Sequence, residues 1–221
     1  MLEAPRRRTQ AERREGTRRA LLSATIQSLV EIGYTRTSTT EVVKRAGVSQ
    51  GALFKHFPSK SALVAAATEQ LFDDLFASFE RAFAKAGKDD EPIVAAVRGL
   101  WRIFCTPELQ VVYRLYTEAT SDPELLSALR PVVVQHEKRL SEFAAGLFPE
   151  IARAQENRVL FEGIVFAMQG MSLQRPVYVP KRAERDLLAS IEAVARTLSP
   201  RSPSSSPLMS PLSPLASRSP S

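Results

Sequence analysis

Apolar residues recur at helical spacing along nearly the whole chain from residue 12 to residue 198, and this periodicity most restricts the folds open to it. Leu22, Ile26 and Leu29, for example, lie at i, i+4 and i+7 and form one stripe on a helix. Gly33 follows as a left-handed stop. No segment alternates apolar and polar residues for long enough to form a strand. The fold class is therefore predicted to be all-α.

Two short helices are marked by the residues that begin and end them. Ser38 and Glu41 have the spacing of a capping box, which predicts a short helix that Gly47 ends. Ser49 caps a second short helix, which runs to about Phe57 before a proline stops it. Two short helices joined by Gly-Val-Ser form a helix-turn-helix motif.

The remaining helices are longer, and several begin with proline in the first turn, where a missing amide hydrogen costs nothing. Together with the short helix at 39–46, helices are predicted near residues 60–86, 91–105, 107–119, 123–147, 150–174 and 181–198.

Composition divides the chain into a basic arm at 1–11, a helix-turn-helix domain at 12–60, a helical domain at 61–198 and a tail at 199–221. The tail holds ten Ser and six Pro among 23 residues and has no periodic apolar face, so it is predicted to be disordered. The arm is either a solubilising segment or a contact in the DNA minor groove, and both alternatives stay open.

The formal net charge of +6 is concentrated at the N-terminus. Residues 1–60 hold twelve Lys or Arg against five Asp or Glu, whereas the remaining residues hold eighteen against nineteen. This asymmetry indicates that the N-terminal part meets a polyanion, either nucleic acid or an acidic membrane surface. The capped short helices argue against the membrane surface.

A helix-turn-helix motif reads DNA because its second helix fits the major groove. Gln50 can pair with a base edge, and Ala52 can touch a thymine methyl group. Hydroxyls, ammonium groups and helix N-termini grip phosphates instead, which suits Thr39, Thr40, Lys55 and Lys60.

About fifty residues combine a cap, a turn, a second helix and a lysine that opens the next helix. The residues that carry this pattern are Gly33-Tyr34, Ser38-Thr39, Val42-Val43, Ala46-Gly47-Val48-Ser49, Gly51, Leu53-Phe54, His56-Phe57, Lys60 and Leu63. This run resembles the DNA-binding domain of TetR-type transcriptional regulators. In one departure, Phe54 stands where the family usually has tyrosine, so a hydroxyl contact to phosphate is lost.

The resemblance implies which residues contact the operator. These are Ser49, Gln50, Gly51, Ala52, Phe54, Lys55 and His56, with Thr39, Thr40 and Lys60 on phosphates. His56 could instead cap the C-terminus of its helix. Phe57 is expected to fill the small core of the domain rather than to touch DNA.

The resemblance also implies that residues 61–198 bind an effector and form a homodimer through the last two helices. The apolar residues assigned to the dimer interface are Leu160, Ile164, Met168, Met171, Leu187, Ile191 and Val194. An apolar or aromatic small molecule is expected in a pocket offered by aromatic side chains. These are Trp101, Phe104, Tyr113, Tyr116 and Phe166.

Other classes of function have little support in the sequence. One cysteine excludes an intrachain disulfide framework, and no stretch has the length of a membrane span or the form of a signal peptide. Cys105 and His136 make a poor catalytic inventory, so no catalytic residue, cofactor or metal site is expected, and an enzyme is disfavoured.

The sequence therefore predicts a cytoplasmic, sequence-specific transcriptional regulator that binds double-stranded DNA as a homodimer. The leading hypothesis is a repressor that a small molecule releases from a palindromic operator. The alternative is an activator, or a DNA-binding regulator without an effector, of the same fold.

Overall fold

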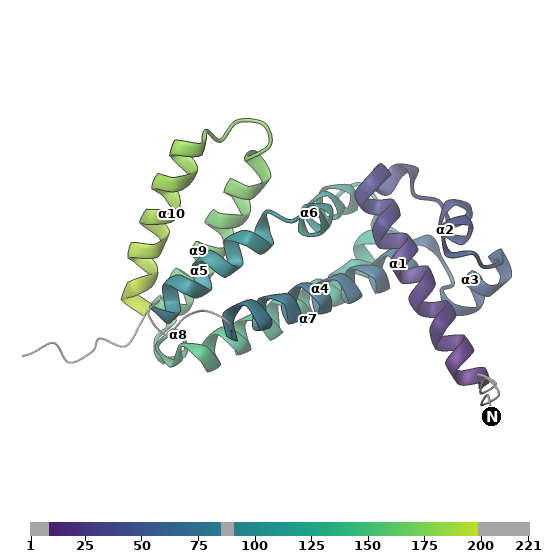
Figure 1. Ribbon diagram of the computed structural model, residues 1–221, viewed down its shortest axis with the longest axis horizontal. Coiled ribbons are helices and arrows are strands. Elements are labelled where there is room, and N and C mark those ends of the chain that lie inside the picture. The colour runs from purple at the N-terminus through teal and green to yellow at the C-terminus, as the bar shows by residue number, and fades with distance from the viewer. Residues whose placement is uncertain (1–8, 85–90, 199–221) are drawn as a thin grey trace, which may run out of the picture.

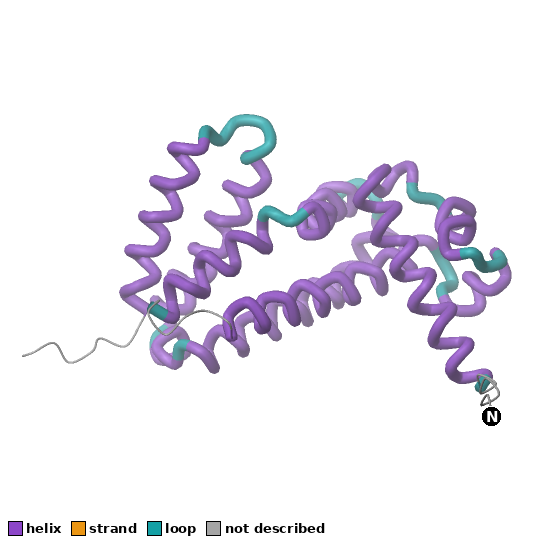
Figure 2. The backbone as a smooth tube through the Cα atoms, viewed as in Figure 1, coloured by secondary structure: helices purple, strands orange, loops and turns teal. Residues whose placement is uncertain are grey.

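The structure is a computed structural model that describes residues 9–84 and 91–198. Within these ranges every regular element is a helix (Figures 1 and 2). The elements are α1 (Gln10–Arg36), α2 (Thr39–Ala46), α3 (Gln50–His56), α4 (Lys60–Ala84), α5 (Pro92–Phe104), α6 (Pro107–Ala119), α7 (Pro123–Leu147), α8 (Pro149–Arg153), α9 (Gln155–Gln174), α10 (Lys181–Ala195) and the 3₁₀ turn η1 (Arg196–Leu198). The prediction of an all-α fold is confirmed. Most of the predicted arm and all of the predicted tail lie outside the described residues.

The helix-turn-helix motif packs on α1 and on the start of α4 at one end of the molecule (Figure 1). Phe57 is only 5% exposed and belongs to the core of this domain, as the sequence predicts. Gly33 has φ 77° and kinks α1, but a last helical turn continues to Arg36 instead of stopping. The other members of this core are Leu21, Leu22, Ala24, Val42, Leu53, Leu63 and Ala67.

The caps of the short helices follow the sequence signals with one correction. The Ser38 hydroxyl accepts a hydrogen bond from the Glu41 amide at 3.1 Å, but the Glu41 carboxylate accepts one from Arg45 at 2.7 Å. Only half of the expected capping box therefore forms, because a cation one turn along competes for the carboxylate. Gly47 adopts the left-handed conformation, with φ 65°, that ends α2.

The second domain is built around the two longest of its helices, α4 and α7, which lie side by side along the molecule (Figure 1). Helices α5, α9 and α10 pack at the end far from α3, and α6 lies between them and α1 (Figure 1). Helix α4 begins in the helix-turn-helix domain and ends in the second domain. A single helix thus belongs to both cores.

The prediction of a single helix at 150–174 is wrong, because the chain forms two helices there. Ala154 has extended backbone angles, φ −138° and ψ 150°, and separates α8 from α9. The side-chain amide of Asn157 donates a hydrogen bond to the Glu150 carbonyl at 2.6 Å. This bond holds the corner by giving a free carbonyl of α8 a partner.

His136 of α7 lies flat against Phe72 of α4, with the ring centroids 3.7 Å apart and the planes 3° from parallel. Burial, and the positive charge of Arg139, lower the pKa of His136 to about 4. The imidazole is therefore neutral near pH 7 and packs as an aromatic ring between the two long helices.

Replacing His136 with Phe tests this role through the pH dependence of stability. Between pH 6.5 and pH 4 the unfolded chain binds a proton at His136 that the folded chain does not, so the wild type loses stability as the pH falls. We expect the wild type to lose about 1–2 kcal/mol more than His136→Phe between pH 7 and pH 5 in urea unfolding. Parallel pH profiles for the two proteins would show that the ring is not held neutral.

Candidate DNA interface and ligand cavity

Two buried anchors, Leu53 and Phe57, fix how α3 is presented at the surface. The Ser49 hydroxyl caps α3 by accepting a hydrogen bond from the Ala52 amide at 3.2 Å. Phe54 is 48% exposed although it is aromatic. Phe57, the C-cap of the same helix, is by contrast in the core. Of the residues assigned to DNA, Thr40, Ser49, Gly51, Phe54 and Lys55 are exposed, whereas Thr39, Gln50, Ala52, His56 and Lys60 are half-buried. Each assignment to DNA stays a prediction.

Gln50 links the two helices of the motif at their N-termini. Its side-chain amide donates a hydrogen bond to the Thr39 hydroxyl at 2.8 Å. A glutamine that is already oriented by a neighbour loses little rotamer entropy when it meets a base edge. The same bond orients the Thr39 hydroxyl at the start of α2, where free backbone amides favour a phosphate.

Two arginines of α1 extend the positive surface beside α3, and the sequence prediction missed them. Burial first, and then the charges of Arg14, Arg18 and Lys55, lower the pKa of His56. Arg18 also lies 6.0 Å from the centre of the Phe57 ring. The i, i+4 spacing of Arg14 and Arg18 on a predicted helix was the signal for this cluster.

Lys60 is held on the protein itself. Its ammonium donates a hydrogen bond to the Tyr34 carbonyl at 2.8 Å and lies 3.9 Å from the centre of the Tyr34 ring. Burial lowers the pKa of Lys60. The lysine therefore ties the start of α4 to the end of α1, and a contact with phosphate would come in addition.

The Tyr34 hydroxyl continues this junction into the second domain. It donates a hydrogen bond to the Asp122 carboxylate at 2.6 Å. Asp122 is also the N-cap of α7 and accepts a bond from the Leu125 amide at 3.0 Å. Burial and the Asp122 carboxylate raise the pKa of Tyr34 to about 12, so the hydroxyl stays protonated and able to donate.

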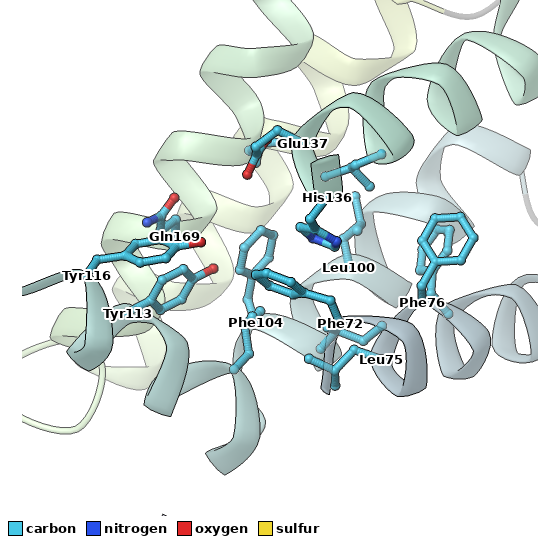
Figure 3. A pocket seen from close by; sticks show the side chains of 15 residues that line it. Phe72, Leu75, Phe76, Leu100, Phe104, Tyr113, Tyr116, His136, Glu137 and Gln169 are labelled. Carbon is cyan, nitrogen blue, oxygen red and sulfur yellow. The ribbon is translucent and has the colours of Figure 1, made fainter. Parts of the chain in front are cut away.

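A cavity of about 70 Å³ lies between α4, α5, α6, α7 and α9 (Figure 3). Of the predicted pocket residues, Phe104, Tyr113 and Tyr116 line it. Trp101 does not, because its indole N–H donates to Glu184 of α10 at 3.1 Å and the ring packs on that side. Phe166 does not line it either, since its side chain is 67% exposed on the outer side of α9. Neither Trp101 nor Phe166 therefore lines this cavity, although Phe166 lines the groove beside it.

The cavity has an apolar end and a polar end. In Figure 3 the rings of Phe72 and Phe76 lie at one side, and the hydroxyls of Tyr113 and Tyr116 lie together at the other. Burial raises the pKa of both tyrosines, so their hydroxyls are neutral. The remaining lining residues are Leu75, Phe79, Leu100, Ile103, Leu109, His136, Glu137, Leu140, Val165 and Gln169.

The polar end adjoins a wider groove of about 590 Å³ between α7 and α9, in which Phe166 takes part. Residues that line both spaces mark the mouth of the cavity. They are Tyr116, Glu137, Leu140, Val165 and Gln169. A ligand could therefore reach the cavity from the surface along this groove.

The predicted dimer residues fall on two different sides of their helices. Ile164, Met168, Met171 and Ile191 are buried in the core of their own protomer, so their assignment to an interface is wrong. Leu187 and Val194 are exposed, and Leu160 is half-buried against the same core. The large apolar side chains of α9 that are exposed are Val159, Phe166 and Leu173.

The exposed apolar residues of α9 and α10 lie on a seam that has the spacing of a helical bundle. On α9 the positions alternate by four and three through Val159, Gly163, Phe166, Gly170 and Leu173. On α10 they do the same through Ala183, Leu187, Ser190 and Val194. We call these nine residues the outer seam.

Among the helices of residues 9–84 and 91–198, none is both long and apolar enough to span a membrane. In the same two segments, no three His, Cys, Asp or Glu side chains are arranged to hold a metal ion.

Comparison with known proteins agrees with this architecture. The family model described as bacterial regulatory proteins, tetR family, matches residues 21–67. An uncharacterised HTH-type transcriptional regulator of Mycobacterium tuberculosis is 34% identical over 148 residues, covering 65% of this chain and 76% of the relative. The HTH-type transcriptional regulator CymR of Pseudomonas putida is 32% identical over 130 residues, covering 59% of this chain and 64% of CymR.

Solved structures share the fold at lower identity. A transcriptional regulator from Streptomyces coelicolor superposes with a TM-score of 0.64 at 22% identity, covering 81% of this chain and 98% of that one. The multidrug binding protein EbrR, complexed with imidazole, superposes with a TM-score of 0.59 at 22% identity, covering 83% of this chain and 94% of EbrR. The chain therefore belongs to the TetR family of transcriptional regulators, whose members bind DNA through a helix-turn-helix domain and are not enzymes.

Proposed function

We propose that this regulator is a homodimeric repressor that a small apolar or aromatic molecule releases from a palindromic operator. One observation carries the proposal: α4 begins beside the helix-turn-helix motif at Lys60, and the middle of the same helix lines the cavity with Phe72, Phe76 and Phe79. A molecule that displaces those rings acts on the helix that supports α3.

DNA recognition is assigned to the exposed side of α3 and to the amides and hydroxyls around it. Gln50 and Ala52 read base edges, while Lys55, Thr40 and the arginines of α1 bind phosphates. His56 adds positive charge when DNA contact raises its pKa. Phe54 supplies apolar contact to a sugar or a thymine methyl group.

Two copies of α3 can reach two half-sites only if the chain dimerises with its recognition helices about 34–36 Å apart. The outer seam suits such a pairing, because α9 and α10 of two protomers would form a four-helix bundle across a two-fold axis. Apolar residues that are exposed in the protomer, Phe166 above all, would then be buried.

Release requires a ligand that binds more tightly to the conformation in which the recognition helices are misplaced. The junction of Lys60, Tyr34 and Asp122 offers a second route besides α4, because it fixes the end of α1 to the first turn of α7. Movement of α7 around a ligand would reach α1 through this hydrogen bond. The regulator is expected to act in the cytoplasm, where its operator lies.

Selection of bound DNA from a random pool tests the function, and the selection is repeated with candidate ligands present. Enrichment of one palindrome, lost when a ligand is added, supports a ligand-released repressor. Enrichment that no ligand changes supports the effector-independent alternative. Transcription from a promoter that carries the palindrome separates repression from activation. Failure to enrich a palindrome contradicts the dimeric model.

Two substitutions in α3 should change the affinities for the selected operator and for random DNA in different ways. Gln50→Ala should lower affinity for the operator by about 1–3 kcal/mol and affect random DNA little, because a base contact is lost. Lys55→Ala should lower the affinities for the operator and for random DNA together. It should also reduce the slope of log binding constant against log salt concentration by about one.

Lys181→Ala is the matched control, since it removes the same charge at the start of α10, far from α3 (Figure 1). Fluorescence anisotropy with operator and random duplexes measures all three variants. An equal loss on both duplexes for Gln50→Ala would count against its role in reading sequence.

Phe166→Asp should dissociate the dimer in sedimentation equilibrium, because it places a charge in the middle of the outer seam. The protomer should stay folded, since this side chain packs on no core of its own. Val134→Asp introduces the same charge at another exposed apolar position, on α7, and should leave the dimer intact. A dimer that survives Phe166→Asp places the interface elsewhere.

A further inference from the structure

We infer that the cavity selects an organic ammonium ion, with an aromatic or branched alkyl body inside the cavity and the positive charge at its mouth beside Glu137. This inference rests on the proposed function, in which the cavity is the effector site, and adds the charge of the ligand to it. Three features of the site support it.

The first feature is acidic charge at the mouth. Glu137 lines both the cavity and the groove, and Glu162 lines the groove beside it. In Figure 3 the Glu137 carboxylate points toward the end of the cavity that holds Tyr113 and Tyr116. Partial burial, and then the negative charge of Glu162, raise the pKa of Glu137. A bound cation would relieve both the desolvation and the repulsion of this carboxylate.

The second feature is that each basic side chain near the cavity either pairs with a carboxylate or is neutral. Arg139 donates to Asp73 at 2.5 Å and lies 4.1 Å from the centre of the Phe76 ring, outside the cavity lining. Lys138 lines the outer groove and pairs with Glu142 at 3.8 Å. His136, the basic side chain in the cavity lining, has a pKa of about 4 and carries no charge near pH 7. An anionic ligand would meet carboxylates there, and no unpaired cation among the residues that line the two spaces.

The third feature is the set of aromatic rings. Phe104 and Tyr113 stack with their ring centroids 6.3 Å apart, and Tyr116 meets Tyr113 edge to face at 6.0 Å. The faces of such rings attract a cation through their quadrupoles. The cavity, at about 70 Å³, takes only part of a ligand, so the charged group is left at the mouth, where Glu137 stands.

The test compares two molecules of the same shape, phenyltrimethylammonium and tert-butylbenzene, which differ in charge alone. Binding to the full chain without DNA is measured by equilibrium dialysis at pH 7.5 and pH 5.0, with benzoate as the anionic probe. We expect the cation to bind at least about ten times more tightly than its neutral counterpart at pH 7.5. The advantage should shrink at pH 5.0, because Glu137 gains a proton as the pH falls through its raised pKa and the probe itself does not titrate.

Glu137→Gln should remove about ten-fold of the affinity for phenyltrimethylammonium and leave tert-butylbenzene unchanged, since the shape of the side chain is kept. Glu124→Gln is the matched control on the same helix, because Glu124 lies outside both linings and should change neither affinity. The titratable or charged groups facing Glu137 are Glu162 on α9, Tyr113 and Tyr116 on α6 and Lys138 on its own helix. Burial raises the pKa of Tyr113 and of Tyr116, so neither hydroxyl titrates between pH 5.0 and 7.5.

Equal affinity for the two isosteres, tighter binding of benzoate, or no binding of either isostere would overturn the inference. An equal loss of both isosteres in Glu137→Gln would do the same, because it would show a structural role. Release of operator DNA is scored separately by anisotropy. A cation that binds through Glu137 without releasing DNA supports the inference and contradicts ligand-controlled release.

Discussion

The hydrogen bond from Tyr34 to Asp122 ties the two domains together beside a buried apolar cluster to which α1, α4, α6 and α7 all contribute. It joins the end of α1 to the cap of α7, residues that are 88 positions apart in the chain. The carbonyl and ring of the same tyrosine hold Lys60 at the start of α4. Tyr34 of α1 thus contacts both the start of α4 and the N-cap of α7.

The domains are also continuous in their packing. Helix α4 contributes Leu63 and Ala67 to the core around the helix-turn-helix motif and Leu71, Phe72 and Phe79 to the core around the cavity. A close-packed helix moves as a unit, because its side chains cannot shift one at a time without opening voids. The helix-turn-helix domain and the cavity are therefore packed against one continuous helix.

Short-range signals in the sequence predict those features that depend on residues close together in the chain. Ser49 caps α3 and Phe57 fills the small core because both roles are set within a few residues of the chain. The side of α9 that faces its own domain could not be predicted in this way. Met168 and Phe166 belong to a helix that is apolar all round, so periodicity does not distinguish the buried side from the exposed one. Trp101 was misplaced for a related reason, since its partner lies on a distant helix.

Helix α4 is shared by the helix-turn-helix domain and the cavity, so ligand binding and operator binding would each affect the other. Coupling between two sites is reciprocal, so a ligand that lowers operator affinity by some factor is itself bound more weakly by that factor when the operator is occupied. The ligand would then saturate free protein at a lower concentration than it saturates protein bound to DNA. The number of copies in the cell, relative to the number of operators, would set how much ligand is captured before any gene responds.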